Sequence, residues 1–200
     1  PYQVLGVRFF ERKEVKDILS FIRAGLNPDS LSDIKRIIDC PPRGIGKTTL
    51  VKMFAKDEAS LPPLAQKRVA DFYKLLDDIK NFALTEKTSK LIQFVSEKTG
   101  IEASLKTEHD EDLERLENIH ELVTLATKYD ILPPEEAVEK LLGDAALASD
   151  QDSLIKNEHA VKLMTVHAAK GLEFPYVFIT GLEQDLFPHR RMNAGNVSKE

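Results

Sequence analysis

Hydrophobic side chains recur every three to four positions through most of this chain, which is the period of an amphipathic helix. In residues 11–27 the apolar positions share one helical face, and an Asn-Pro pair ends the pattern. The same period continues through most of residues 29–142. Pro62-Pro63 opens one long stretch and Gly100 closes another, as proline and glycine do at helix starts and ends. The middle of the chain is therefore predicted to be almost entirely helical.

The two ends of the chain follow a different pattern. Residues 2–10, "YQVLGVRFF", form a short β-rich run broken by Gly6. Residues 143–160 are small and polar and are predicted to form a linker. After them, "AVKLMTV" (160–166) and "YVFITGL" (176–182) are β-branched and nearly continuously apolar, as in buried parallel strands. The pattern predicts a mixed, mainly α fold in which a helical subdomain is inserted in an α/β domain.

Composition narrows the class of protein. With 42% hydrophobic and 30% charged residues, the chain has the make-up of an ordinary soluble domain. Its single cysteine, Cys40, excludes a disulfide framework and a cysteine-based metal cluster, and it is typical of a reducing compartment. No apolar run reaches the length of a membrane span. The net charge of −5 gives no general attraction to nucleic acid, so such binding would depend on local patches.

The stretch "PPRGIGKTTL", residues 41–50, contains the end of a nucleotide-binding loop, Gly46-Lys47-Thr48. A complete phosphate loop has a further glycine five residues before Gly46, where this chain has Pro41, followed by Pro42. Proline has no N–H to donate to a phosphate, and its φ is fixed. The stretch is therefore not predicted to bind ATP.

A second interpretation fits these residues better. A helix ending near Asp39, a tight turn, and a helix from about Lys47 form a helix-hairpin-helix pattern. Gly44 and Gly46 are both able to take a positive φ and to leave N–H groups uncovered. The free N–H groups at the start of the next helix would bind a DNA phosphate, with Arg43 and Lys47 adding charge. An ordinary turn between two helices, with a glycine hinge, is the alternative.

Residues 163–189 contain a second cluster, in which polar residues follow a predicted strand. The cluster comprises Thr165, His167, Lys170, Gly171 and Glu173. Each has an ordinary explanation by itself, as a loop histidine, a solvated charge or a turn glycine. Together they lie at the carboxyl end of a strand, where open α/β sheets bind ligands.

Three segments resemble the UvrD/PcrA/Rep superfamily 1 DNA helicases. "TVHAAKGLEF" resembles motif V, T-[LV]-H-x-[AS]-K-G-L-E-[FW], and the likeness continues through "VFITGLEQDLFPH". "VRFFERKEVKD" resembles G-x-R-F-x-E-R-x-E-[IV]-K-D, with only one glycine before it. "RIIDCPPRGIG" resembles R-[IV]-[IV]-N-x-P-x-R-G-I-G, with Asp39 where Asn is usual. The likeness is weak in residues 60–150.

The resemblance implies a domain plan and an activity. Residues 1–24 and 156–200 would be parts of an incomplete RecA-like motor domain (2A), and residues 25–155 would be the helical 2B subdomain inserted in it. The parent would be an ATP-dependent 3′–5′ DNA helicase that uses ATP and Mg²⁺, with the remaining motor domains acting in cis. The chain itself is expected to be an inactive fragment, without catalytic residues, a metal site or a bound cofactor. It has no Walker A or Walker B motif, and the arginine-finger motif is expected beyond residue 200.

The same resemblance implies roles for individual residues. The hairpin would contact duplex DNA, and motif V would contact the single-stranded backbone and the ATP ribose. Arg12 has a second explanation, as an exposed charge at a helix start beside Glu14. The predicted nucleotide-binding residues are Gly171 and Glu173. The predicted DNA-binding residues are Arg8, Arg12, Arg43, Gly44, Ile45, Gly46, Lys47, Thr48, Thr165, His167 and His189.

Two other classes of function remain open from the residues alone. One is a stand-alone DNA- or protein-binding module that kept the hairpin without a motor. The other is a helical interaction protein that binds no DNA. The helicase interpretation carries an expected location, the bacterial cytoplasm, with attachment to the nucleoid through DNA and no contact with a membrane.

Overall fold

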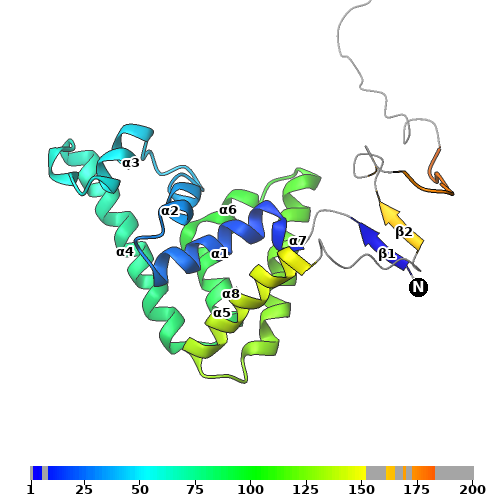
Figure 1. Ribbon diagram of the computed structural model, residues 1–200. Helices are drawn as coiled ribbons and strands as arrows, with labels where there is room; N and C mark the ends of the chain where they lie inside the picture. Colours follow the sequence, from blue (N-terminus) through cyan, green and yellow to red (C-terminus); the bar gives the residue numbers. More distant parts are fainter. Residues whose placement is uncertain (1, 6–8, 152–160, 165–168, 170–172, 183–200) are drawn as a thin grey trace, which may run out of the picture. The chain divides into compact units, whose positions relative to one another are not determined.

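The computed structural model describes residues 2–5, 9–151, 161–164, 169 and 173–182 of the 200-residue chain (Figure 1). The chain divides into two compact units. A helical unit is built from Val7–Ala160, and a strand unit combines Tyr2–Gly6 with Val161–Glu200. Among the described residues the fold is mainly α, as the hydrophobic period predicts.

The helices begin and end close to their sequence signals. Pro63 occupies the first turn of its helix, and Gly100, with φ +83°, ends another in the left-handed conformation that glycine favours. None of the described helices has the length and apolarity needed to cross a bilayer. The α-helices are α1 Lys13–Leu26, α2 Leu31–Ile37, α3 Lys47–Phe54, α4 Pro63–Thr85, α5 Thr88–Thr99, α6 Ile101–Leu105, α7 Asp110–Ala126 and α8 Pro134–Gln151. The short 3₁₀ helices are η1 Phe9–Glu11, η2 Glu58–Ser60 and η3 Thr127–Tyr129.

Helix α8 is longer than the sequence pattern predicts. Residues 143–160 are predicted to form a polar linker, but α8 continues through the first part of that stretch to Gln151. Alanine and leucine in "GDAALASD" are strong helix formers, and Ala145 is buried against the core. The small residues therefore extend a helix here instead of interrupting it.

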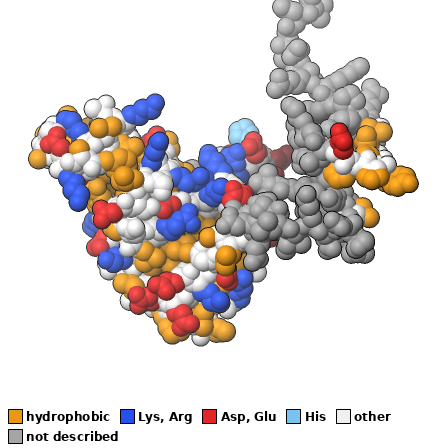
Figure 2. Space-filling view, in the orientation of Figure 1, with side chains coloured by type: hydrophobic (Ala, Val, Ile, Leu, Met, Phe, Trp, Pro, Cys, Tyr) orange, Lys and Arg blue, Asp and Glu red, His pale blue; other side chains and the backbone are white. Residues whose placement is uncertain are grey.

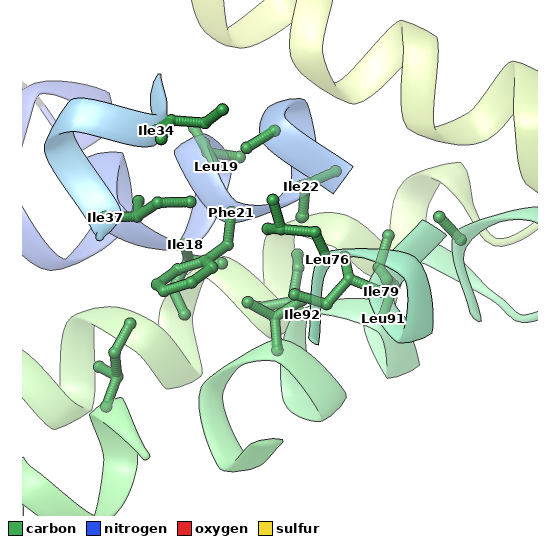
Figure 3. Packing of buried hydrophobic residues seen from close by; sticks show 14 of the residues in the cluster. Ile18, Leu19, Phe21, Ile22, Ile34, Ile37, Leu76, Ile79, Leu91 and Ile92 are labelled. Atoms are coloured by element: carbon green, nitrogen blue, oxygen red, sulfur yellow. The ribbon is translucent and has the colours of Figure 1, made fainter. Parts of the chain in front are cut away.

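Helix α1 is the centre of the helical unit (Figure 1). It packs against α2, α4, α5 and α7, and it is buried on almost every side. It passes so close to α4 that a Cβ on Gly25 would lie 3.1 Å from the carbonyl oxygen of Leu76. The resulting core is shown in Figure 3 and includes Ile18, Leu19, Phe21, Ile22, Ile34, Ile37, Leu76, Ile79, Leu91 and Ile92.

The packing of α1 bears on the predicted domain plan. The sequence places residues 1–24 in the motor domain, whereas residues 13–24 lie in the core of the helical unit. Even the polar side chains of α1 have partners there: the Asn118 amide of α7 donates to Glu14 Oε1 at 2.6 Å. The hydrophobic period alone does not assign α1, because the apolar face of a core helix has the same period in either domain.

The strand unit contains two paired strands in its described part. Strand β1 (Tyr2–Leu5) runs parallel to β2 (Val161–Met164), with Tyr2 opposite Val161 and Leu5 opposite Met164. These strands lie within the predicted runs 2–10 and 160–166. The helical unit occupies the long crossover that a parallel pair requires.

The third predicted strand is absent from the described residues. Residues 176–182 have no strand assignment, and their side chains are exposed, with Phe178 at 90%. Figure 2 shows hydrophobic side chains gathered at the surface of this segment. The expectation of a buried strand was therefore wrong for this chain. Burial of such a strand requires a sheet face to cover it, and two four-residue strands provide very little.

Candidate nucleic-acid interface

The candidate DNA-contact segment lies between α2 and α3. Helix α2 ends at Ile37 and α3 begins at Lys47, so residues 38–46 form the connection. The peptide bond between Cys40 and Pro41 is cis. The hairpin presents one face to the helical core and the other to solvent, and the two faces have different chemistry.

Arg43 holds the inner face of the hairpin. Its guanidinium lies 5.2 Å from the ring centroid of Phe21 in α1, and burial lowers its pKa. Nη2 donates to the carbonyl oxygen of Thr99 at 2.9 Å, which ties the hairpin to the end of α5. Nη1 donates to three further carbonyl oxygens, those of Ile37 (3.3 Å), Cys40 (2.9 Å) and Pro41 (2.9 Å). Both terminal nitrogens of Arg43 therefore donate to backbone carbonyl oxygens of the protein, whereas the sequence predicts that Arg43 contacts a phosphate.

Other side chains anchor the hairpin to α1. The carboxylate of Asp17, only 5% exposed, accepts from Arg36 Nε at 2.7 Å and from the Cys40 thiol at 3.3 Å. Desolvation by burial, with the nearby Asp17 charge, raises the pKa of Cys40 to about 11. Ile45 is buried as well, so its predicted role in DNA contact is restricted to its backbone. The inner face is therefore fixed by the helical unit itself.

The outer face is exposed and rich in donors. Gly44, Gly46, Lys47 and Thr48 are all exposed. The first N–H groups of α3 have no partner within the helix, and in the described structure no side chain caps this end. The helix dipole adds partial positive charge at the same point, beside the ammonium group of Lys47. This combination suits a phosphate.

The two hairpin glycines have different backbone conformations. Gly44 has φ +67°, in the left-handed region predicted for it. Gly46 has φ −80°, which any residue can adopt, and a Cβ built there would meet no atom within 4 Å. The prediction of a positive φ was therefore wrong at Gly46. As the residue that caps α3, it needs an extended conformation instead.

Arg68 of α4 also lies at this face, and no sequence motif pointed to it. Its Nη1 donates to the carbonyl oxygen of Gly44 at 2.9 Å. A Cβ on Gly44 would lie 2.7 Å from the same nitrogen, so a side chain there would displace the Arg68 guanidinium. Arg68 lies in another helix, far along the chain, and no short motif contains both residues.

The hairpin does not fit a nucleotide-binding loop. Pro41 and Pro42 have no N–H, and the N–H of Arg43 donates to Asp39 Oδ1 at 3.1 Å. Three successive amides are therefore unable to bind a phosphate chain. The loop also follows a helix, α2, where a phosphate loop would follow a strand.

Arg12, which is predicted to lie near single-stranded DNA, is engaged within the helical unit. It caps α1 and is half-buried, with Nη1 bonded to Asn118 Oδ1. The same nitrogen lies 3.8 Å from Glu121 Oε2, and the guanidinium lies 5.5 Å from the ring centroid of Phe9. The contacts of Arg12 with α7 account for this side chain without a ligand. They also give it a more specific role than that of an exposed charge at a helix start.

The motif V residues fall mostly outside the described residues. Glu173 is described and exposed. The other predicted site residues of the strand unit, together with Arg8, lie outside the described residues: Thr165, His167, Gly171 and His189. The structure therefore brings together the hairpin residues and Arg68, and the single-strand and nucleotide contacts stay predictions.

Comparison with known proteins identifies the class. The family model described as UvrD-like helicase C-terminal domain matches residues 1–200. The chain belongs to this family, which confirms the resemblance to the UvrD/PcrA helicases.

The individual relatives that the chain resembles are named as ATP-dependent DNA helicases. The chain is 33% identical over 239 residues to the ATP-dependent DNA helicase UvrD1 of Mycobacterium tuberculosis, an alignment that covers 100% of the chain and 31% of that protein. It is 33% identical over 208 residues to the ATP-dependent DNA helicase PcrA of Bacillus subtilis, covering 93% of the chain and 28% of the relative. It is 35% identical over 210 residues to the ATP-dependent DNA helicase PcrA of Staphylococcus aureus, an alignment that covers 96% of the chain and 29% of that protein. The chain thus spans less than a third of the length of these relatives.

Proposed function

We propose that the chain is part of an ATP-dependent DNA helicase that unwinds duplex DNA with 3′–5′ polarity. The names of its relatives and the match over the whole chain support this function. In the parent, ATP and Mg²⁺ would be bound mainly by groups from the remaining motor domains, since this sequence has no Walker A or Walker B motif. Gly171 and Glu173 would complete the nucleotide cleft, and Thr165, His167 and His189 would contact single-stranded DNA.

The proposed domain plan is a helical 2B subdomain inserted in a RecA-like domain 2A. The parallel pairing of β1 with β2 supports it, because the chain leaves and re-enters one sheet on either side of the helical unit. We assign α1 to the helical subdomain on the basis of its packing, and this moves the first boundary from residue 24 to near residue 7.

The part of this function that the geometry supports best is contact with duplex DNA through the hairpin. One observation carries it: the uncapped N-terminus of α3, exposed beside Lys47, lies on a hairpin that Arg43 and Asp17 fix from behind. A rigid group of donors loses little conformational freedom when it binds a phosphate. Binding would be independent of sequence, because phosphate contacts carry no base information.

A salt titration with a labelled duplex tests this proposal. Two to three engaged phosphates predict a log–log slope of about −2 to −3, with an affinity in or below the non-specific range of roughly 10⁻⁴ to 10⁻⁶ M. Lys47→Glu should weaken binding and flatten the slope by about one unit. Lys140→Glu, an identical charge change at an exposed position of α8, is the matched control. Equal effects of the two substitutions would show that the hairpin has no special role.

The motor part of the proposal has a separate test. We propose that this chain alone hydrolyses no ATP above background, because the loop before Lys47 begins with Pro41 and Pro42 and lacks the N–H groups that hold a nucleotide phosphate. Hydrolysis is measured with and without DNA. DNA-stimulated turnover that Lys47→Ala abolishes would restore the nucleotide-binding interpretation of residues 41–50.

A further inference from the structure

The inward orientation of Arg43 leaves the outer face of the hairpin with one fewer cation than its sequence suggests. Lys47 remains exposed there, but the guanidinium of Arg43 is bonded to four carbonyl oxygens. Arg68 approaches the same face from α4. Arg68, and not Arg43, is therefore the arginine that is open to a phosphate on this face.

Most N–H donors of the Arg68 guanidinium form no hydrogen bond within the described structure. Its side chain is exposed, and its one hydrogen bond in the described structure is the bond from Nη1 to the Gly44 carbonyl. No carboxylate of the described residues forms an ion pair with it. A guanidinium has five N–H donors in a planar fork, so most of them stay open to solvent. Arginine in this state is well suited to a bidentate contact with a phosphate.

The position of Arg68 matches the donors at the start of α3. Gly44 and Lys47 are three residues apart, so even a fully extended chain separates them by no more than about 10 Å. One DNA strand carries one phosphate per 3.4 Å of helix axis, so a span of about 10 Å covers roughly three successive phosphates. The Arg68 guanidinium and the α3 N-terminus are therefore able to engage the same stretch of backbone.

We propose that Arg68 is a phosphate-binding residue of the hairpin, and that it contacts a backbone phosphodiester of duplex DNA while its bond to the Gly44 carbonyl positions it. This inference rests on the proposed function of the hairpin. Gly44 suits this arrangement because its φ of +67° favours glycine and because a side chain there would displace the guanidinium. It also restores the number of cations on the outer face to two, Lys47 and Arg68.

The test measures duplex binding by the chain at several salt concentrations. Arg68→Gln removes the charge and keeps an N–H donor for the Gly44 carbonyl. We expect it to lower affinity roughly tenfold at low salt and to flatten the salt slope by about one unit. Arg68→Lys should restore the slope and part of the affinity, since an ammonium keeps the charge but not the fork. Lys67→Ala, at the adjacent exposed position, is the matched control and should change affinity by less than about threefold and leave the slope unchanged.

The outcomes separate this inference from the proposed function. A chain that binds no duplex at low salt overturns both. Binding that Lys47→Glu weakens and Arg68→Gln leaves intact, with the parent slope, overturns the role of Arg68 alone. Thermal melting followed by circular dichroism distinguishes a structural role: a lower Tm for Arg68→Gln with an unchanged salt slope means that Arg68 only stiffens the hairpin, and the inference is then wrong.

Discussion

The hairpin at residues 38–46 and the segment at residues 173–182 carry two of the proposed contact sites, and their surroundings are opposite. The hairpin is fixed by side chains of its own unit, and its exposed face consists of glycines, backbone N–H groups and Lys47. The second segment exposes large apolar side chains, including Tyr176 at 85% and Phe178 at 90%.

This difference shows which site is complete within the chain. The hairpin needs nothing more to hold its shape, so its chemistry is open to measurement here. A contiguous exposed apolar run marks a contact surface, and under the proposed domain plan the rest of the RecA-like domain would cover residues 176–182.

The largest expected effect is the removal of the inner anchor of the hairpin. Arg43→Ala leaves the carbonyl oxygens that it now satisfies without a donor and removes the contact with Phe21. We expect a loss of about 3 kcal/mol in the free energy of unfolding, measured by urea denaturation. Lys35→Ala, at an exposed position of α2, should cost less than about 0.5 kcal/mol. Similar small losses for both would mean that the hairpin is not anchored through Arg43.

Arg43 and Arg68 also show how far sequence reasoning reached. The hairpin, the helix boundaries near it and the left-handed Gly44 could be predicted, because caps, prolines and glycines act on their immediate neighbours. The direction of the Arg43 side chain depends on Phe21 and Thr99, which are distant in sequence. No local pattern contains that information.

The same limit applies to the larger elements. The hydrophobic period predicts that α1 is a helix. The domain to which a helix buried on nearly all sides belongs is shown only by the helices that pack against it. Residues 176–182 were predicted to be a buried strand because their composition suits one, and composition does not show whether a covering sheet is present. Tertiary contacts decided both cases.

The second expected effect comes from the two hairpin glycines. Gly44→Ala forces an alanine into φ +67° and displaces the Arg68 guanidinium, at a cost of about 2 kcal/mol. Gly46→Ala is the matched control, since φ is −80° and the space is open, and it should change stability by less than about 0.5 kcal/mol. Denaturation of the two variants measures the difference. Equal costs would show that the Gly44 conformation is not strained by a side chain.

The third expected effect is a pH dependence at the base of the hairpin. The pKa of Cys40 is raised from 9.0 to about 11 by burial and by Asp17, so the folded protein keeps the thiol proton longer than the unfolded chain does. The folded state therefore binds more protons between about pH 9 and pH 11, and stability falls as pH rises through this window. The loss should be on the order of 1 kcal/mol, because the thiol is partly exposed and solvent screens it.

Comparison with Cys40→Ala isolates this titration from those of lysines and tyrosines in the same window. The variant lacks the thiol, so the difference in unfolding free energy between the two proteins should shrink from pH 9 to pH 11. A difference that stays constant across the window would mean that the Cys40 thiol is not held in its protonated form by the fold.

The smallest expected effect lies in the other region of the comparison. Phe178 is 90% exposed and belongs to no helix or strand, so Phe178→Ser removes almost no buried area and should change the free energy of unfolding by less than about 0.5 kcal/mol. Phe72 of α4, only 1% exposed, is the matched control, and its replacement by alanine should cost about 3–5 kcal/mol. In a longer chain that contains the remaining motor domains, the same Phe178→Ser should become costly, because the proposed covering sheet would bury the ring. A loss above about 1 kcal/mol in the present chain would show that residues 173–182 already pack within it, and the contrast with the hairpin would then fail.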